Sequence, residues 1–421
     1  MKEKENAYIV GIRTQRQTRE EALDSMQELK CLAESAGASV VGETFCDLER
    51  INPATFIGKG KAREIGSSAN ETCSDLVIFD KSLSPAQQRN LENLNNHRIL
   101  DRTSLILDIF SQRAQTKEGK LQVELAQLKY LLPRLTRMWK HLSRLGAGIG
   151  TRGPGETQLE VDRRKIRQRI DKLSDELKKV RNRRRLQRSG RKKTGFTSIA
   201  LVGYTNAGKS TLMNALTGSN ALVQDKLFAT LDPTIRILDL PNGRQVIVSD
   251  TVGFISNLPH QLVEAFRATL EEVVDADLLI HVIDATSENT NEQINAVNKV
   301  LHELNADKKP CINVYNKIDA CNQWIPGQIR TEHGDNSFAI SAKKQRGLAE
   351  LIEAITHFEN QRTQISTFRI PFRESRIAAE IHEDGEVISE TFDEHAYIIR
   401  SRVPFTVYNR FENYIVEDDA E

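Results

Sequence analysis

Eight consecutive residues near the middle of the chain have the spacing G-x-x-x-x-G-K-[ST], which suits them to bind phosphate groups. They are Gly203, Tyr204, Thr205, Asn206, Ala207, Gly208, Lys209 and Ser210. In such a loop the glycines let backbone N–H groups turn toward the phosphates, the lysine reaches the β- and γ-phosphates, and the serine hydroxyl binds Mg²⁺. The apolar run 197–202 predicts a strand before the loop, and 210–217 predicts a helix after it. This strand–loop–helix context is the one that a nucleotide-binding loop requires.

Three further motifs, each after an apolar run, predict which nucleotide binds. A carboxylate at 250 can hold Mg²⁺ through water, and the N–H of residue 253 can contact the γ-phosphate. The carboxylate of Asp319 can accept hydrogen bonds from guanine N1–H and the exocyclic amine; adenine presents a different edge, so GTP is selected over ATP. The segment 341–343 can supply a backbone N–H to guanine O6. The residues of these motifs are Asp250, Thr251, Val252, Gly253, Asn316, Lys317, Ile318, Asp319, Ser341, Ala342 and Lys343.

A polar segment with a proline lies where a nucleotide-dependent switch is expected, between the phosphate loop and Asp250. Its residues are Phe228, Ala229, Thr230, Leu231, Asp232, Pro233 and Thr234. A switch needs a threonine whose hydroxyl completes the Mg²⁺ shell only while the γ-phosphate is present. Thr230 and Thr234 both have the required chemistry, and the order of the motifs does not choose between them. The other threonine is then an ordinary turn or strand-start residue.

The residue that follows Gly253 is Phe254, where many regulatory GTPases carry a glutamine that orients the attacking water. An apolar side chain cannot orient water, so we expect slow intrinsic hydrolysis, or a partner that positions the water. Asn206 offers a second source of catalysis, because an asparagine at this loop position helps some GTPases to bind K⁺, which acts like an arginine finger. The alternative is that Asn206 only stabilises the loop. Lys209, Gly253 and one of the two threonines, Thr230 or Thr234, are therefore the candidate catalytic residues, and Ser210 and the same threonine are the candidate metal ligands.

The composition is that of a globular chain. Of 421 residues, 39% are hydrophobic and 28% are charged. There is no run of 18 apolar residues, and the N-terminal sequence lacks the apolar core of a signal peptide. The cysteines are scattered and odd in number, at 31, 46, 73, 311 and 321, which favours reduced thiols. We expect a cytoplasmic protein that acts as a monomer.

The net charge of +1 conceals an uneven distribution. Residues 134–193 contain 21 lysines and arginines but only 6 aspartates and glutamates, a surplus of +15. A segment this basic in an otherwise acidic protein favours binding to a polyanion, above all nucleic acid. The alternative, a solvated charged helix, would normally mix the two signs.

The same region contains two stripes of apolar residues at heptad spacing. The first comprises Leu121, Leu125, Leu128, Leu132, Leu135, Trp139 and Leu142, and the second comprises Leu159, Ile166, Ile170, Leu173, Leu177 and Val180. Two such stripes predict an antiparallel coiled-coil hairpin, which Pro133 should kink or loosen. The connecting loop, 145–155, contains five glycines and a proline, so we expect its order to depend on a partner. The alternative is a plain connector.

Patterns along the chain predict the α/β fold class with four parts. An N-terminal α/β domain with a mostly parallel sheet spans 1–110, the basic hairpin spans 111–190, a doubly wound P-loop GTPase domain spans 197–361, and a small α+β domain spans 366–421. In the first part we predict strands at 8–11, 39–41, 76–80 and 98–100, and helices at 20–35 and from Ser84-Pro85. The glycine- and lysine-rich turn 58–61 is expected to precede a helix, with a second nucleotide or an RNA contact as the alternative. In the last part we predict strands at 376–382, 387–392 and 396–400, a turn at 383–385, and a short helix at 408–414.

The residues quoted above resemble those of the HflX family of translation-factor-related GTPases over nearly the whole chain. The resemblance includes the phosphate loop, the switch segment and 250–254, and it is most specific in VELAQLKYLLPRL (123–135) and GPGETQLEVDRR (153–164). It aligns Thr230 with the family's Mg²⁺-binding threonine. It also implies binding of the 50S ribosomal subunit, contact of the hairpin loop with ribosomal RNA, splitting of stalled or idle ribosomes under stress, and release on hydrolysis of GTP to GDP.

Two other functions fit the residues. One is a signalling GTPase whose basic hairpin binds a protein partner or another RNA. The other is an RNA-binding module in which the nucleotide is structural. Cosedimentation with ribosomal subunits in a non-hydrolysable GTP analogue discriminates the first alternative, and turnover stimulated by 50S subunits discriminates the second.

Overall fold

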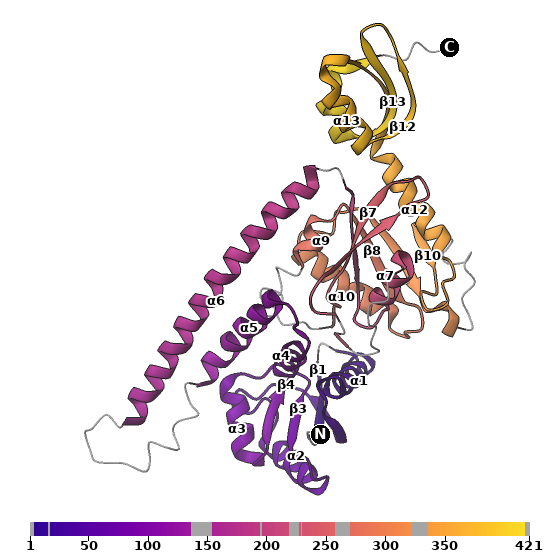
Figure 1. Cartoon of the computed structure of the whole chain (residues 1–421). Coiled ribbons are helices and arrows are strands. Elements are labelled where there is room, and N and C mark those ends of the chain that lie inside the picture. Colours follow the sequence, from indigo (N-terminus) through magenta and orange to yellow (C-terminus); the bar gives the residue numbers. More distant parts are fainter. Residues whose placement is uncertain are drawn as a thin grey trace. The chain divides into compact units, whose positions relative to one another are not determined.

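A computed structural model of the chain describes residues 4–15, 17–135, 154–193, 196–218, 227–228, 230–256, 270–321 and 336–416 (Figure 1). The chain folds into two compact units. The first contains Met1–Arg181 together with the described residues of 224–232 and 252–269, and the second contains 182–223, 233–251 and 270–421. The described residues of 228–232 in the switch segment and of 252–269 therefore belong to the N-terminal unit, although they lie between strands of the GTPase domain in sequence.

The N-terminal domain is a four-stranded parallel sheet with strand order β2-β1-β3-β4. Its strands are β1 (Asn6–Thr14), β2 (Ser39–Leu48), β3 (Leu76–Phe79) and β4 (Arg98–Asp101), and its helices are α1 (Arg19–Ala36), α2 (Lys59–Glu71), α3 (Pro85–Asn95) and α4 (Arg102–Arg113). Each predicted strand is present. The helix expected after residues 58–61 begins earlier than predicted, because Lys59 already opens α2 and only Gly58 precedes it. Ser84 caps α3 through a reciprocal bond with Gln87, and Pro85 occupies the first turn. The prediction of a parallel α/β domain is confirmed.

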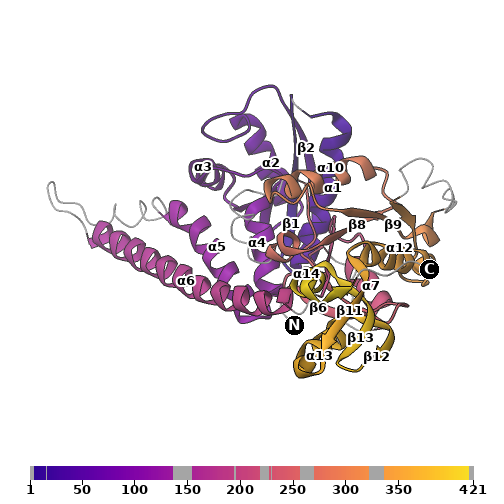
Figure 2. The same cartoon turned by 90° about the horizontal axis from the view of Figure 1, so that it is seen from above.

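The basic region forms two neighbouring helices, α5 (Lys117–Leu135) and α6 (Pro154–Lys193), seen side by side in Figures 1 and 2. Leu121 and Leu125 of α5 pack with Leu173 and Leu177 of α6 in one buried cluster, as the heptad stripes predict. Arg169 adds a two-pronged ion pair with Glu124, at 2.7 and 2.8 Å. Helix α5 continues through Pro133 and ends at Leu135. Most of the predicted tip, 145–153, lies outside the described residues.

The GTPase domain is a six-stranded sheet with strand order β10-β9-β8-β5-β7-β6, in which only β6 runs antiparallel to its neighbour. Its strands are β5 (Ser198–Gly203), β6 (Thr234–Asp239), β7 (Gln245–Asp250), β8 (Leu278–Asp284), β9 (Cys311–Asn316) and β10 (Ser337–Ala339). Its described helices are α7 (Lys209–Thr217), α9 (Glu271–Asp275), α10 (Thr290–Glu303) and α12 (Leu348–Gln361). The order of the parallel strands reverses on either side of β5, which confirms the doubly wound prediction.

The C-terminal domain is a βαββαβ unit, and it corrects one prediction. Its elements are β11 (Thr363–Pro371), α13 (Ser375–Asp384), β12 (Glu386–Phe392), β13 (Ala396–Pro404), α14 (Phe405–Arg410) and β14 (Ile415–Val416), with the antiparallel strand order β12-β13-β11-β14. The predicted strand at 376–382 was wrong, because Ala378 and Ile381 are buried on one side of a helix. Their three-residue spacing is a helical period. The predicted turn at 383–385 is the end of that helix, and β11 was missed.

A buried polar network holds the C-terminal sheet to the GTPase sheet. Arg244, in the turn between β6 and β7, donates to Glu359 Oε1 of α12 at 3.1 Å and to the carbonyl of Arg402 in β13 at 2.8 Å. The other oxygen of Glu359 accepts from the Thr197 hydroxyl. Glu359 is buried, so these contacts replace the hydration that its charge loses. The pair of strands β6 and β7, the second of which ends at Asp250, is thereby fixed to the C-terminal domain.

All five cysteines are free thiols. Among the helices of the described ranges, none is both long enough and apolar enough to span a membrane.

Candidate guanine-nucleotide site

The phosphate loop follows β5 and has a backbone that only glycine allows at two positions. Gly203 has a φ of +151°, and a Cβ there would lie 2.2 Å from the carbonyl oxygen of Val282. Gly208 has a φ of +95°, and its Cβ would meet Asn316 Nδ2 at 2.3 Å. Side chains at these positions would push the loop away from β8 and β9. The two glycines therefore keep the backbone N–H groups close to the sheet edge where phosphate is expected.

Lys209 and Ser210 open helix α7, where the helix dipole favours an anion. The Lys209 ammonium donates to the carbonyls of Gly203 and Tyr204 at 3.1 and 2.8 Å, which holds it across the loop. Burial lowers the pKa of Lys209 to about 8, against the opposing pull of Asp250. The Ser210 hydroxyl donates to Asp250 Oδ2 at 2.5 Å. These two oxygens, one neutral and one a buried carboxylate, are the hard ligands that suit Mg²⁺.

Asn316, the first residue of the motif 316–319, is hydrogen-bonded to both the phosphate loop and the loop 341–343. Its side-chain N–H donates to the carbonyl of Ala207 in the phosphate loop at 2.9 Å. Its side-chain oxygen accepts from the N–H of Ala342 at 3.0 Å. Because Asn316 is buried at the end of β9, it fixes the phosphate loop and the 341–343 loop on one strand.

Asp319, the carboxylate predicted to bind guanine, lies just beyond β9. Asp319 Oδ1 accepts from the Ser341 hydroxyl at 2.6 Å. That hydrogen bond is the main reason that the pKa of Asp319 is lowered, and Lys344 and Lys343 add to it. Asp319 is therefore a carboxylate, an acceptor only, as pairing with the N–H groups of guanine requires.

Asp284, which the sequence analysis did not single out, contacts one of the predicted site residues, Lys317. It ends β8 and pairs with the Lys317 ammonium at 2.6 Å. Lys317 itself adopts a φ of +68°. The sequence pattern that predicted a role for Asp250 also applies to Asp284. In both cases a carboxylate stands at the end of a buried strand, at the sheet edge where ligands bind.

The described residues of 228–232, the first part of the switch segment, pack within the N-terminal unit. Phe228 and Leu231 are buried, and Thr230 between them is half-buried. The Asp232 carboxylate accepts hydrogen bonds from residues that precede α5. Ala229 lies outside the described residues. In the other unit, Thr234 is the first residue of β6, where an ordinary strand-start residue is expected.

The segment that follows Asp250 is also buried. Thr251 donates its hydroxyl to the carbonyl of Leu201 at 2.6 Å, which fixes the end of β7 to β5. Phe254 is 1% exposed, so its ring cannot orient a water molecule. Two residues later, the carbonyl of Ser256 accepts from Arg102 of α4 at 3.4 Å. Arg102 is itself buried against Asp80, at 2.8 Å.

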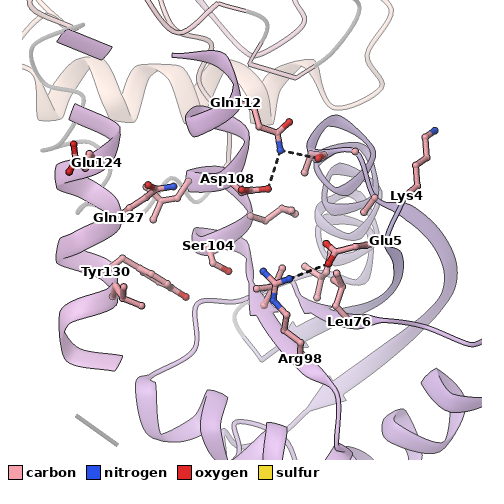
Figure 3. A pocket seen from close by; sticks show the side chains of 18 of the residues that line it. Lys4, Glu5, Leu76, Arg98, Ser104, Asp108, Gln112, Glu124, Gln127 and Tyr130 are labelled. Atoms are coloured by element: carbon pink, nitrogen blue, oxygen red, sulfur yellow. Dashed lines mark hydrogen bonds and ion pairs between the residues drawn. The ribbon is translucent and has the colours of Figure 1, made fainter. Parts of the chain in front are cut away.

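A cavity of about 1120 Å³ is lined by residues of the N-terminal domain and of helix α5 (Figure 3). No residue of the nucleotide motifs lines it. Leu76 of β3 and Leu100 of β4 contribute apolar surface, and Ser104 and Tyr130 come from α4 and α5. At its rim, Gln112 donates to Asp108 at 3.1 Å, and Arg98 pairs with Glu5 at 3.3 Å. The glycine- and lysine-rich turn 58–61 does not line this cavity.

We predict that guanine-nucleotide binding takes up a proton above pH 8. The lowered pKa of Lys209, about 8, makes the empty site partly neutral there, whereas bound phosphates favour the ammonium form. The affinity for guanine nucleotide should therefore be independent of pH below pH 8, and it should fall by up to about tenfold for each pH unit above pH 8. Titration calorimetry in buffers of different ionisation enthalpy measures this uptake at pH 8.5. Binding without proton uptake at that pH would contradict a neutral Lys209.

Family models match the N-terminal domain, the basic hairpin and most of the GTPase domain, and known relatives match nearly the whole chain. The models for the GTP-binding GTPase N-terminal region, the GTP-binding GTPase middle region and the 50S ribosome-binding GTPase match residues 23–111, 113–191 and 198–317. The GTPase HflX of Caldanaerobacter subterraneus is 50% identical over 99% of this chain and 95% of its own. The GTPase HflX of Escherichia coli is 43% identical over 93% of each chain. A solved structure of a GTP-binding protein from Sulfolobus solfataricus in complex with GDP is 27% identical, covering 85% of this chain and 99% of that one, with a TM-score of 0.44. The chain belongs to the HflX family of GTPases, and it binds and hydrolyses GTP.

Proposed function

We propose that this GTPase binds the 50S ribosomal subunit in its GTP form, separates stalled or idle ribosomes in the cytoplasm, and leaves after hydrolysis. It acts as a monomer. The observation that carries the proposal is the basic helical hairpin, which has a surplus of +15 in residues 134–193. A surface of this charge attracts RNA phosphates strongly and in a salt-dependent way. The match of residues 198–317 to a 50S ribosome-binding GTPase model supports the same partner.

The packing of the hairpin suits it to reach into RNA. The leucine cluster and the Arg169–Glu124 pair stiffen the two helices against each other. The glycine-rich loop 145–155 connects these two stiff helices. Because the helices resist bending, the free energy of binding at the loop is not used to deform them. We infer that this loop enters ribosomal RNA and that the arms transmit the resulting displacement between subunits.

The nucleotide chemistry follows from the residues of the site. Bound Mg²⁺ would neutralise phosphate charge, with Ser210 as a direct ligand, Asp250 acting through water, and Thr230 as the ligand that requires the γ-phosphate. Lys209 contacts the β- and γ-phosphates, and the N–H of Gly253 contacts the γ-phosphate. K⁺ held by Asn206 is the second ion that the residues admit.

Deleting the hairpin tip tests the proposal. We predict that replacing residues 145–155 by a short glycine–serine linker leaves GTP affinity unchanged and abolishes subunit splitting, because nucleotide contacts lie elsewhere. Light scattering of 70S ribosomes measures the splitting. A same-length glycine–serine replacement is the control for loop length. Splitting at the wild-type rate in the deleted variant would make the tip a connector only.

Cosedimentation decides whether the ribosome is the partner at all. The protein should pellet with 50S subunits in a non-hydrolysable GTP analogue and much less in GDP. A signalling GTPase with a protein partner would pellet in neither state.

A further inference from the structure

The switch segment is attached to the start of helix α5 through Asp232. The Asp232 carboxylate accepts from the backbone N–H groups of Gln115 and Thr116, both at 2.9 Å, and from the Thr116 hydroxyl. The same hydroxyl accepts from the N–H of Gly119 at 3.0 Å. Thr116 thus caps the first turn of α5, and Asp232 binds the two residues directly before that turn, where a negative charge is favourable.

The other end of the segment is anchored as well. Phe228 is 1% exposed, and its ring packs edge-on against Phe110 of α4, with the ring centroids 4.6 Å apart. Phe228 has a φ of +55°, an uncommon conformation for a bulky residue that its packing must maintain. Leu231 is 2% exposed. Thr230 therefore lies between two fixed points on the α4–α5 junction.

Gly119 is the residue of α5 that makes room for this attachment. A Cβ at Gly119 would lie 2.3 Å from Asp232 Oδ1, closer than side chains approach. Gly119 sits inside a helix, where glycine is ordinarily unfavourable relative to alanine. By contrast, a Cβ at Gly60, in the first turn of α2, would meet no atom within 4 Å.

We propose that Asp232 is a positioning residue for GTP, holding the switch segment on α5 so that Thr230 is pre-ordered for the γ-phosphate. This inference rests on the proposed role of Thr230 at Mg²⁺. A segment released from α5 would have more conformations to lose when the γ-phosphate orders it, so GTP binding would weaken. GDP lacks the γ-phosphate and does not use Thr230, so its affinity should not change. The coupling is reciprocal, and GTP should tighten the start of the hairpin arm.

The decisive experiment compares Gly119→Ala and Asp232→Ala with the control Gly60→Ala in the full-length protein. Affinities for GDP and for a non-hydrolysable GTP analogue are measured by titration with Mg²⁺. We expect both test variants to lose about 5- to 150-fold in analogue affinity, the usual range of such couplings, with GDP affinity unchanged. Gly60→Ala should match the wild type. Unchanged GDP affinity also shows that a variant is folded.

Hydrogen exchange gives the second measurement, and Thr230→Ala separates the two levels of inference. The amides of Gln115 and Thr116 should be better protected with the analogue than with GDP in the wild type, and equally protected in Gly119→Ala. Analogue affinity that is unchanged or tighter in Gly119→Ala overturns the inference. If Thr230→Ala weakens the analogue while Gly119→Ala does not, only the positioning role fails. If Thr230→Ala has no effect, the proposed role of Thr230 fails first.

Discussion

Asp319→Asn should weaken GTP binding by about 10²–10⁴-fold and shift preference toward xanthine nucleotides. The carboxylate is ionised and presented by Ser341 through a hydrogen bond of 2.6 Å. Two hydrogen bonds from guanine to a charged acceptor each contribute about 1.5–3 kcal/mol. An asparagine has one oxygen and one amide group, so it would keep one bond and place a donor against another donor. Xanthine carries a carbonyl where guanine carries the amine, and it can accept from that amide.

The measurement is a titration of GTP and of the xanthine analogue against wild type and variant. Asp307→Asn is a matched control, because Asp307 is an exposed carboxylate of the same domain. GTP affinity that is equal in Asp319→Asn and wild type would remove Asp319 from guanine recognition. A loss of affinity for both nucleotides would indicate instead that the loop had moved.

GTP turnover should be slow in the free protein and about 10³–10⁵-fold faster on the 50S subunit, the range that an oriented water and a stabilised γ-phosphate provide in GTPases. Phe254, where a water-orienting glutamine is common, is 1% exposed and has no polar atom in its side chain. The ribosome could supply the missing function by ordering Thr230 and Gly253, or by placing a charged group beside the phosphate. K⁺ at Asn206 is the competing source of charge.

Four rates separate these possibilities: turnover with and without 50S subunits, each in K⁺ and in Na⁺. Stimulation by 50S in both salts assigns catalysis to the ribosome. Stimulation by K⁺ alone assigns it to the phosphate loop. A fast free enzyme that ignores both would show that another residue of this chain orients the water.

The sequence alone determined the nucleotide, because its recognition depends on short local patterns. Each motif follows a buried strand, and parallel strands present their carboxyl ends at one edge, so the sequence pattern alone places Lys209, Asp250 and Asp319 there. The hairpin was equally predictable, since Leu121 and Leu173 belong to stripes with a fixed period. Asp284 could have been found by the same rule.

Tertiary structure alone decided the contacts between residues that are far apart in the chain. Asp232 meets Thr116 across a separation of 116 residues, and no local pattern links them. The same applies to Arg244 and Arg402, whose contact attaches the C-terminal domain. At 376–382 we predicted a strand, but burial of Ala378 and Ile381 against the sheet favoured a helix. Local propensity is worth only tenths of a kcal/mol per residue, so packing against a distant surface overrides it.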